Sequence, residues 1–156
     1  MPEREVALKD LLPLIQAQLE SGKKVTFSPR GVSMLPMLRQ GKDKVTLSPV
    51  KGPLKKYDLP LYRLDNGKFI LHRIVDTGET YTCRGDNTYR LERGIRQNQL
   101  IAVVSSFTRG NRTISVDDPV YMLYCRVWNE TYPLRNFVRR GIGWIKRRIL
   151  RVIRKV

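Results

Sequence analysis

Apolar positions follow a helical period at the start of the chain. Between residues 6 and 19 they recur at intervals of three and four, and Ser21-Gly22 ends the pattern. We therefore expect a helix near residues 3–21. Pro13 lies inside this segment and predicts a kink or a restart, because proline lacks the N–H that a helical hydrogen bond needs.

From residue 24 the pattern alternates with a period of two, which is typical of half-buried strands. Two turn sequences, Asp65-Asn66-Gly67 and Arg109-Gly110-Asn111-Arg112, predict hairpins. This run of short strands predicts a mainly β fold, either a small coiled barrel or mixed sheets. The expected strands are Lys24–Phe27, Lys44–Leu47, Leu59–Leu64, Lys68–Val75, Glu79–Arg84, Leu100–Phe107 and Thr113–Val116.

The helical period returns after Asp118, which we expect to be an N-cap with Pro119 at the first helical position. Pro133 is expected to interrupt the helix that follows, and a basic amphipathic segment lies beyond it. The predicted organisation is an N-terminal helix over residues 1–23, a β domain over 24–117, and aromatic and basic amphipathic helices over 118–156.

The charge of the chain is strongly positive. Of its 156 residues, 30 are Lys or Arg and 14 are Asp or Glu, which gives a net charge of +16. Such a surplus indicates an anionic partner, either nucleic acid or an acidic membrane surface. No nucleic-acid recognition motif or aromatic stacking platform is present, so we expect an anionic membrane surface. The residues predicted to dock there are Arg139, Arg140, Trp144, Lys146, Arg147, Arg148 and Arg151.

An alternative leaves this C-terminal helix packed on the β core by its apolar stripe, with a solvated basic face.

The chain has no apolar run of transmembrane length, and its N-terminus is too acidic for a secretory signal. We therefore expect a cytoplasmic protein, peripheral on the inner face of the cell membrane if the tail docks. One histidine and two scattered cysteines do not predict a metal site, and no cofactor is expected.

Two sequence features carry the candidate chemistry. Ser33 lies in Gly31-Val32-Ser33-Met34-Leu35-Pro36, and the only histidine is His72, in Leu71-His72-Arg73-Ile74-Val75. A serine hydroxyl is a poor nucleophile unless a base takes its proton, and imidazole suits that work near neutral pH. Taken alone, each has an ordinary explanation, since serine is a common helix N-cap and a histidine in a strand is commonly structural.

The order of these segments resembles that of the signal-peptidase and LexA-like serine peptidases. Gly31–Pro36 is similar to their nucleophile box, Gly41–Val45 and Lys56–Leu59 to the next elements, Leu71–Val75 to the base box, and Arg84–Asn87 to the acidic box. The resemblance covers residues 24–107, about half of the chain. Because it has a histidine at the base position, the chain resembles the archaeal and endoplasmic-reticulum-type branch of these peptidases.

This resemblance implies a serine endopeptidase with Ser33 as nucleophile and His72 as general base. It leaves two candidates for the third catalytic member, Glu92 and Asp86, and Asp86 is equally well explained as a turn residue. Gly31 would allow a sharp bend before Ser33, whose own N–H would serve as oxyanion donor.

By the same resemblance, the substrate would be an extended leader or precursor peptide. Two alternatives remain open. One is a LexA-like self-cleaving regulatory module, although residues 1–23 are too short for its helix-turn-helix. The other is a catalytically silent relative that serves as a membrane or partner adaptor.

Overall fold

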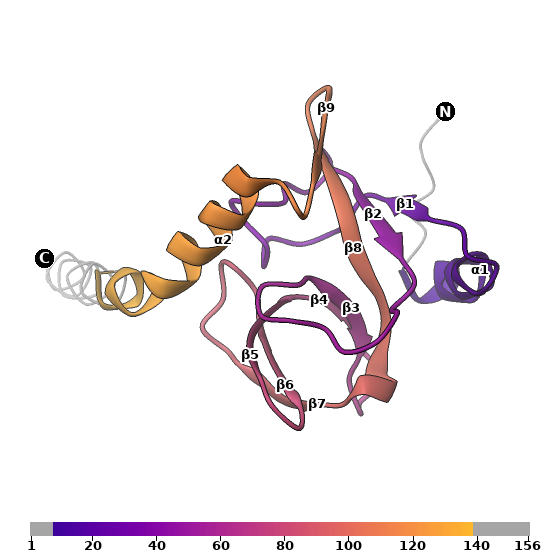
Figure 1. Cartoon of the computed structure of the whole chain (residues 1–156), viewed down its shortest axis with the longest axis horizontal. Helices are drawn as coiled ribbons and strands as arrows, with labels where there is room; N and C mark the ends of the chain where they lie inside the picture. The colour runs from indigo at the N-terminus through magenta and orange to yellow at the C-terminus, as the bar shows by residue number, and fades with distance from the viewer. Residues whose placement is uncertain (1–7, 139–156) are drawn as a thin grey trace, which may run out of the picture.

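The computed structural model describes residues 8–138, which form a mainly β structure with helices at both ends (Figure 1). Nine strands in this part of the chain make two antiparallel sheets. The prediction of mixed sheets with an N-terminal helix is confirmed, whereas the described strands do not close into a barrel. The seven residues predicted to dock on a membrane lie outside the described residues: Arg139, Arg140, Trp144, Lys146, Arg147, Arg148 and Arg151.

The larger sheet is built around one long strand, β8 (Leu100–Arg109). On one edge β8 pairs with β2, and on the other it pairs first with β3 and further along with β9. The strand order is β1-β2-β8-β3-β4, and β9 pairs with β8 outside this path. The remaining strands of this sheet are β1 (Val25–Phe27), β2 (Val45–Ser48), β3 (Pro60–Arg63), β4 (Phe69–Leu71) and β9 (Arg112–Ser115). The two predicted hairpins join β3 to β4 and β8 to β9, as expected.

The smaller sheet consists of β5 (Arg73–Thr77), β6 (Tyr81–Arg84) and β7 (Glu92–Ile95). A short 3-10 helix, η1 (Gln97–Gln99), then leads into the larger sheet. The sequence did not predict β7, because this strand has no alternation of apolar and polar residues. Its only buried side chain is Ile95, which packs with Tyr81 and Ile74 in a second small core.

The predicted strand Lys68–Val75 is wrong in one respect, since the structure divides it into β4 and β5. The two halves belong to different sheets, because β4 pairs with β3 and β5 pairs with β6. His72 is the residue at the break. The candidate base therefore lies where the chain passes from one sheet to the other.

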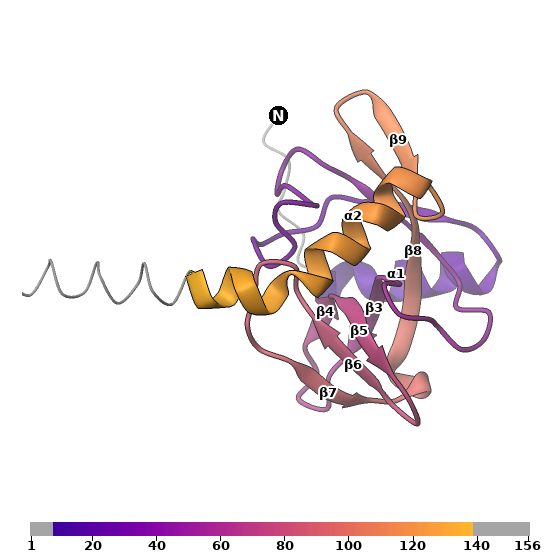
Figure 2. The same ribbon diagram turned by 60° about the vertical axis from the view of Figure 1, so that its left-hand side comes forward.

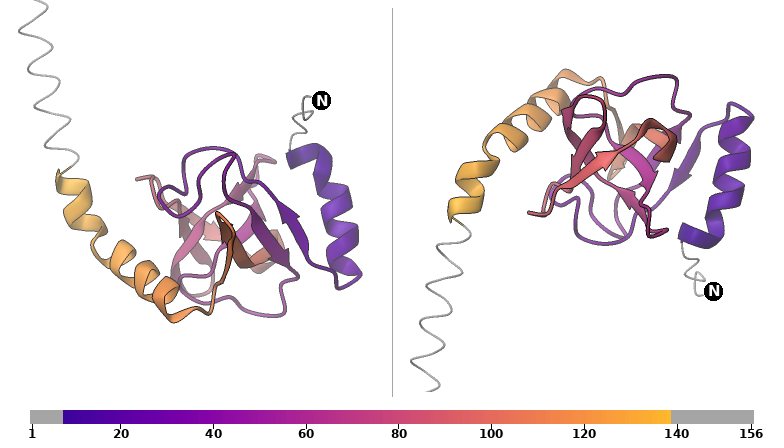
Figure 3. Two further views of the ribbon diagram at one scale, coloured as in Figure 1. Left: turned by 90° about the horizontal axis from the view of Figure 1, so that it is seen from above. Right: turned by 90° about the horizontal axis from the view of Figure 1, so that it is seen from below.

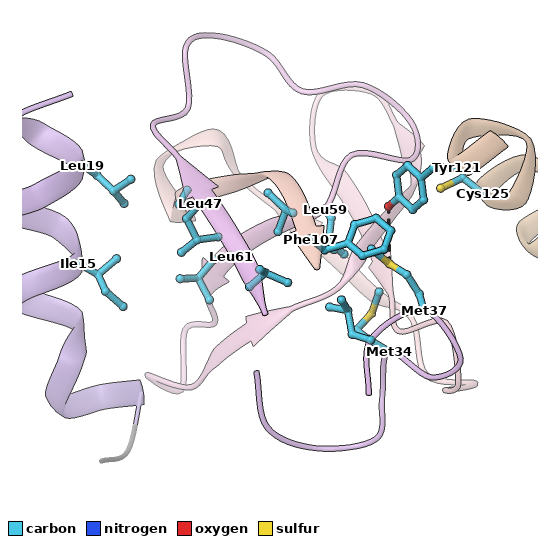
Figure 4. Packing of buried hydrophobic residues seen from close by; sticks show 14 residues of the cluster. Ile15, Leu19, Met34, Met37, Leu47, Leu59, Leu61, Phe107, Tyr121 and Cys125 are labelled. Carbon is cyan, nitrogen blue, oxygen red and sulfur yellow. Dashed lines mark hydrogen bonds between the residues drawn. The ribbon is translucent and has the colours of Figure 1, made fainter. Parts of the chain in front are cut away.

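Helix α1 (Leu8–Glu20) runs through Pro13 as one element, so the predicted restart does not occur. Its Ile15 and Leu19 are buried in the main core. Figure 4 shows these two side chains at one end of the core and Tyr121 and Cys125 at the other.

Helix α2 (Pro119–Glu130) begins as predicted, with the Asp118 carboxylate accepting hydrogen bonds from the N–H groups of Val120 (2.9 Å) and Tyr121 (3.0 Å). It ends before Thr131, and residues 132–138 form a second helical segment, so the interruption falls close to Pro133. The two helices α1 and α2 lie on opposite sides of the strands (Figures 1 and 3). None of the described helices has the length and apolar character needed to cross a bilayer.

Candidate active site

Ser33 lies in a series of turns between β1 and β2. Met34, Met37 and Leu38 are buried beneath these turns and anchor them in the main core. Gly31 has a φ of +92°, so the backbone does bend before the serine in a conformation that favours glycine. Ser33 itself is half-buried. Among the described residues, neither its hydroxyl nor its N–H has a hydrogen-bond partner, which leaves both groups available to a ligand.

His72 is paired with a carboxylate. Its Nδ1 lies 2.9 Å from Oε2 of Glu92, and the two side chains are only 8% and 10% exposed. The hydroxyl of Tyr62, from β3, lies 3.5 Å from the same oxygen. A carboxylate on Nδ1 holds the imidazole in the tautomer whose Nε2 is free to accept a proton. The pair therefore has the arrangement of a general base with its orienting acid.

Gly85 lies where the serine segment and the histidine meet. A Cβ atom added there would be 2.6 Å from the carbonyl oxygen of Ser33 and 2.8 Å from Nε2 of His72. Both atoms therefore lie within 3 Å of one point, and the sum of the two distances is the upper limit of their separation. Only glycine fits, because real Cβ contacts essentially never fall below 3.0 Å.

Further bonds join the Gly85 segment to the serine segment. The N–H of Asn87 donates to the Ser33 carbonyl at 2.8 Å, and the Asn87 side-chain amide donates to the Val32 carbonyl at 3.0 Å. The structure thus brings Ser33 and His72 into one neighbourhood. It does not form a hydrogen bond between the Ser33 hydroxyl and the imidazole. Such bonds often tighten only in a complex with substrate.

Asp86 does not contact the histidine. Both of its oxygens accept hydrogen bonds from the Arg73 guanidinium, at 2.8 Å each, and one also accepts from the Tyr124 hydroxyl at 3.1 Å. The carboxylate is 1% exposed. Of the two candidates for the third member, the structure therefore places Glu92 against His72 and Asp86 against Arg73.

Arg73 is the centre of a buried polar network. Besides Asp86, its guanidinium donates to the Tyr121 hydroxyl (2.9 Å), to Sγ of Cys125 (2.9 Å), to Sδ of Met37 (3.0 Å) and to the Tyr57 carbonyl (3.1 Å). Burial by itself lowers the pKa of Arg73, but the adjacent Asp86 carboxylate more than offsets this and raises it well above its ordinary value. Arg73 is thus a permanently charged link between α2, the serine segment and the Gly85 segment.

The pairing of Arg73 with a carboxylate agrees with what the sequence predicts, whereas the close approach at Gly85 was not predicted. The nearest signal was the Arg84–Asn87 motif, in which a glycine precedes an acid, but a single sequence does not show which arginine that acid binds. The two cysteines are buried free thiols, and burial raises the pKa of Cys83 to about 12.

Among the described residues, no group of three His, Cys, Asp or Glu side chains is placed to hold a metal ion.

No family model matches the chain, and neither the curated proteins nor the solved structures include a match to it. The case for a function therefore depends on the order of the sequence motifs and on the geometry of these residues.

Proposed function

We propose that the protein is a serine endopeptidase of the signal-peptidase-like type, with Ser33 as nucleophile, His72 as general base and Glu92 as the acid that orients it. One observation carries the proposal. His72 Nδ1 is held by Glu92 at 2.9 Å, while its Nε2 faces the point beside Gly85 that also borders Ser33. A base held by an acid, close to the backbone of a serine whose hydroxyl has no partner among the described residues, supports nucleophilic catalysis by that serine.

The proposed reaction has two halves. Ser33 Oγ attacks the peptide carbonyl carbon while His72 Nε2 takes its proton, and Glu92 stabilises the resulting imidazolium. The imidazolium then gives this proton to the leaving amine as the C–N bond breaks, which leaves an acyl ester on Ser33. In the second half, water loses a proton to His72 and attacks the ester, and the released Ser33 oxygen recovers that proton.

The oxyanion formed in each half needs a hydrogen-bond donor. The N–H of Ser33 is without a partner among the described residues, and it would serve as this donor. Loss of one such donor typically lowers the rate by about 10²–10³-fold.

An extended precursor peptide is the substrate that fits this site. The strand β4 ends the order of the larger sheet, so one of its edges has no strand partner among the described residues, and β4 leads directly into His72. A peptide that paired with this edge would gain main-chain hydrogen bonds and pass close to the imidazole.

The basic C-terminal residues support a location on an anionic membrane surface, and we propose that the protein works in the cytoplasm at the inner face of the cell membrane. Basic side chains near such a surface contribute about 1 kcal/mol each. This attraction should weaken steeply as salt is added.

The direct test replaces Ser33. Ser33→Ala should abolish cleavage of a fluorogenic peptide library, whereas Ser106→Ala, which removes another half-buried hydroxyl from the middle of β8, should leave cleavage unchanged. Cleavage that persists in Ser33→Ala would refute the proposal. Wild-type protein that cuts only its own chain would favour the self-cleaving module, and folded protein with no hydrolytic activity would favour the adaptor.

A further inference from the structure

The outward side of α2 and of residues 132–138 is apolar. Large hydrophobic side chains recur there at intervals of three, four and seven residues, and each is at least half exposed. We call this set the outer apolar face; it consists of Val120 (77%), Leu123 (61%), Val127 (52%), Leu134 (65%), Phe137 (78%) and Val138 (50%). These exposed fractions show that the rest of the protein does not cover these side chains, and in Figures 1 and 2 the helical residues 132–138 extend away from the strands.

The opposite side of α2 is already used in packing. Tyr121 and Cys125 are buried in the main core, and Nε1 of Trp128 donates to the Asp86 carbonyl at 2.9 Å. The fold therefore requires an apolar inner side, but it does not require the outer apolar face. Large exposed apolar side chains that recur along a helix in this way mark a binding site for an apolar partner.

The charge around the outer apolar face identifies the partner. Arg126 is exposed beside it, and the acidic Glu130, which lies between Val127 and Leu134, is paired with Lys56, whose Nζ lies 3.1 Å away. The Tyr57 hydroxyl donates to the same Glu130 oxygen at 2.8 Å. The chain then continues with eight basic and no acidic residues over 139–156. An apolar helix face with a phenylalanine and a positive border is the pattern of a helix that lies in the interface of an anionic bilayer.

We propose that the outer apolar face inserts into the interfacial region of an anionic membrane. A second copy of the chain is a poorer occupant, because it would bring two strongly positive surfaces together. The inner side of α2 is tied to Asp86 and Arg73, so insertion would also hold the candidate active site in one orientation relative to the bilayer. This inference does not depend on peptidase activity, and it shares with the proposed function only the attraction of the basic residues to the membrane.

The test measures binding of the full chain to sedimenting vesicles of phosphatidylcholine and phosphatidylglycerol at low and at high salt. The variant Leu123→Gln with Val127→Gln removes apolar surface without changing charge. It should weaken partitioning by about tenfold or more and abolish the binding that remains at high salt. The matched control is Leu14→Gln on α1, since Leu14 is exposed to the same 61% as Leu123, and it should bind like wild type.

A second variant separates the contribution of apolar insertion from that of electrostatic attraction to the membrane. Lys146→Gln with Arg147→Gln and Arg148→Gln should weaken binding at low salt and leave the salt-resistant part in place. Wild-type binding by the Leu123/Val127 variant at both salt concentrations would overturn the proposal. So would sedimentation velocity that showed a wild-type dimer, turned into a monomer by these two substitutions, because the face would then bind a second copy.

Discussion

At the scale of residues, the site depends on close approach at Gly85. The Asn87 N–H donates to the Ser33 carbonyl, and this carbonyl oxygen and His72 Nε2 lie 2.6 and 2.8 Å from the position that a Cβ atom on Gly85 would occupy. Its φ is not in the left-handed region, so glycine is required for lack of a side chain and not for its conformational freedom. The close packing of the Ser33 backbone and the imidazole around Gly85 therefore depends on the absence of a side chain at this residue.

We expect Gly85→Ala to lower peptide cleavage by at least about 10²-fold, because displacement of a reacting group by about 1 Å has an effect of that size. Overpacking should also lower the free energy of unfolding by about 1–3 kcal/mol. Cleavage rates and urea unfolding measure the two effects. The control is Gly78→Ala, since a Cβ there meets nothing within 4 Å. Full activity in Gly85→Ala would show that the contact does not position the site.

The two carboxylates should respond differently to loss of charge. Glu92→Gln should reduce kcat by about 10²-fold or more with little change in stability, because the isosteric amide no longer stabilises the imidazolium. Asp86→Asn should instead lower the free energy of unfolding by about 3–5 kcal/mol, because it leaves the buried Arg73 charge without its partner. Steady-state kinetics and urea unfolding of both variants test this. The reverse result would give Asp86 the catalytic role.

At the scale of elements, local patterns predicted most of the fold. Both hairpins, the Asp118 cap and seven strand segments were visible in turn residues and in alternation, although one of those segments is two strands. The remaining features depend on contacts between distant parts of the chain. β7 is a strand because Tyr81 and Cys83 of β6 pair with it. The break at His72 exists because β3 and β6 belong to different sheets.

The candidate site could likewise be predicted only where it does not depend on contacts between distant parts of the chain. Ser33 and His72 were found from residue type and order, since one serine motif and one histidine are enough to suggest the pair. The choice between Glu92 and Asp86 could not be made in this way. Each is an acid near the end of the same sheet, and only the fold determines that one meets His72 and the other meets Arg73.

The cap of α2 allows a test at this scale. Asp118→Ala should lower the free energy of unfolding by about 1 kcal/mol, because the N–H groups of Val120 and Tyr121 lose their acceptor. Asp117→Ala removes the same charge from an exposed neighbour, whose side chain does not cap the helix, and should have a smaller effect. Equal losses of stability in the two variants would exclude the cap as the cause.

At the scale of the whole molecule, two ion pairs each hold a buried carboxylate. One is Arg73–Asp86 and the other is Arg39–Asp43, in which the guanidinium donates to both Asp43 oxygens at 3.0 and 2.8 Å. Asp43 is completely buried just before β2. In a molecule with a net charge of +16, these carboxylates offset part of the repulsion among positive groups.

Asp43 makes the stability of the molecule dependent on pH. Hydrogen bonds from Arg39 hold the pKa of the Asp43 carboxyl below its ordinary value of 3.8, in spite of burial. Its contribution is therefore complete above that value and is lost as pH falls through the lower pKa of the folded state. Asp43→Asn should lower the free energy of unfolding at pH 7 by about 1–3 kcal/mol. It should also flatten the fall in stability below about pH 4.

Urea unfolding over a range of pH measures both effects, with Asp76→Asn as the control at an exposed position. An unchanged acid slope in Asp43→Asn would show that other carboxylates dominate acid unfolding.

The central claim is that the Ser33 hydroxyl is a nucleophile activated by His72. The most direct measurement is mass-spectrometric mapping of the residue that a fluorophosphonate probe modifies in the folded wild-type protein and in His72→Gln. The account predicts an adduct on Ser33 in the wild type and a loss of about 10²–10⁴-fold in its rate of formation in His72→Gln. An adduct on any other serine, equal rates in the two proteins, or no adduct on folded wild-type protein would contradict it.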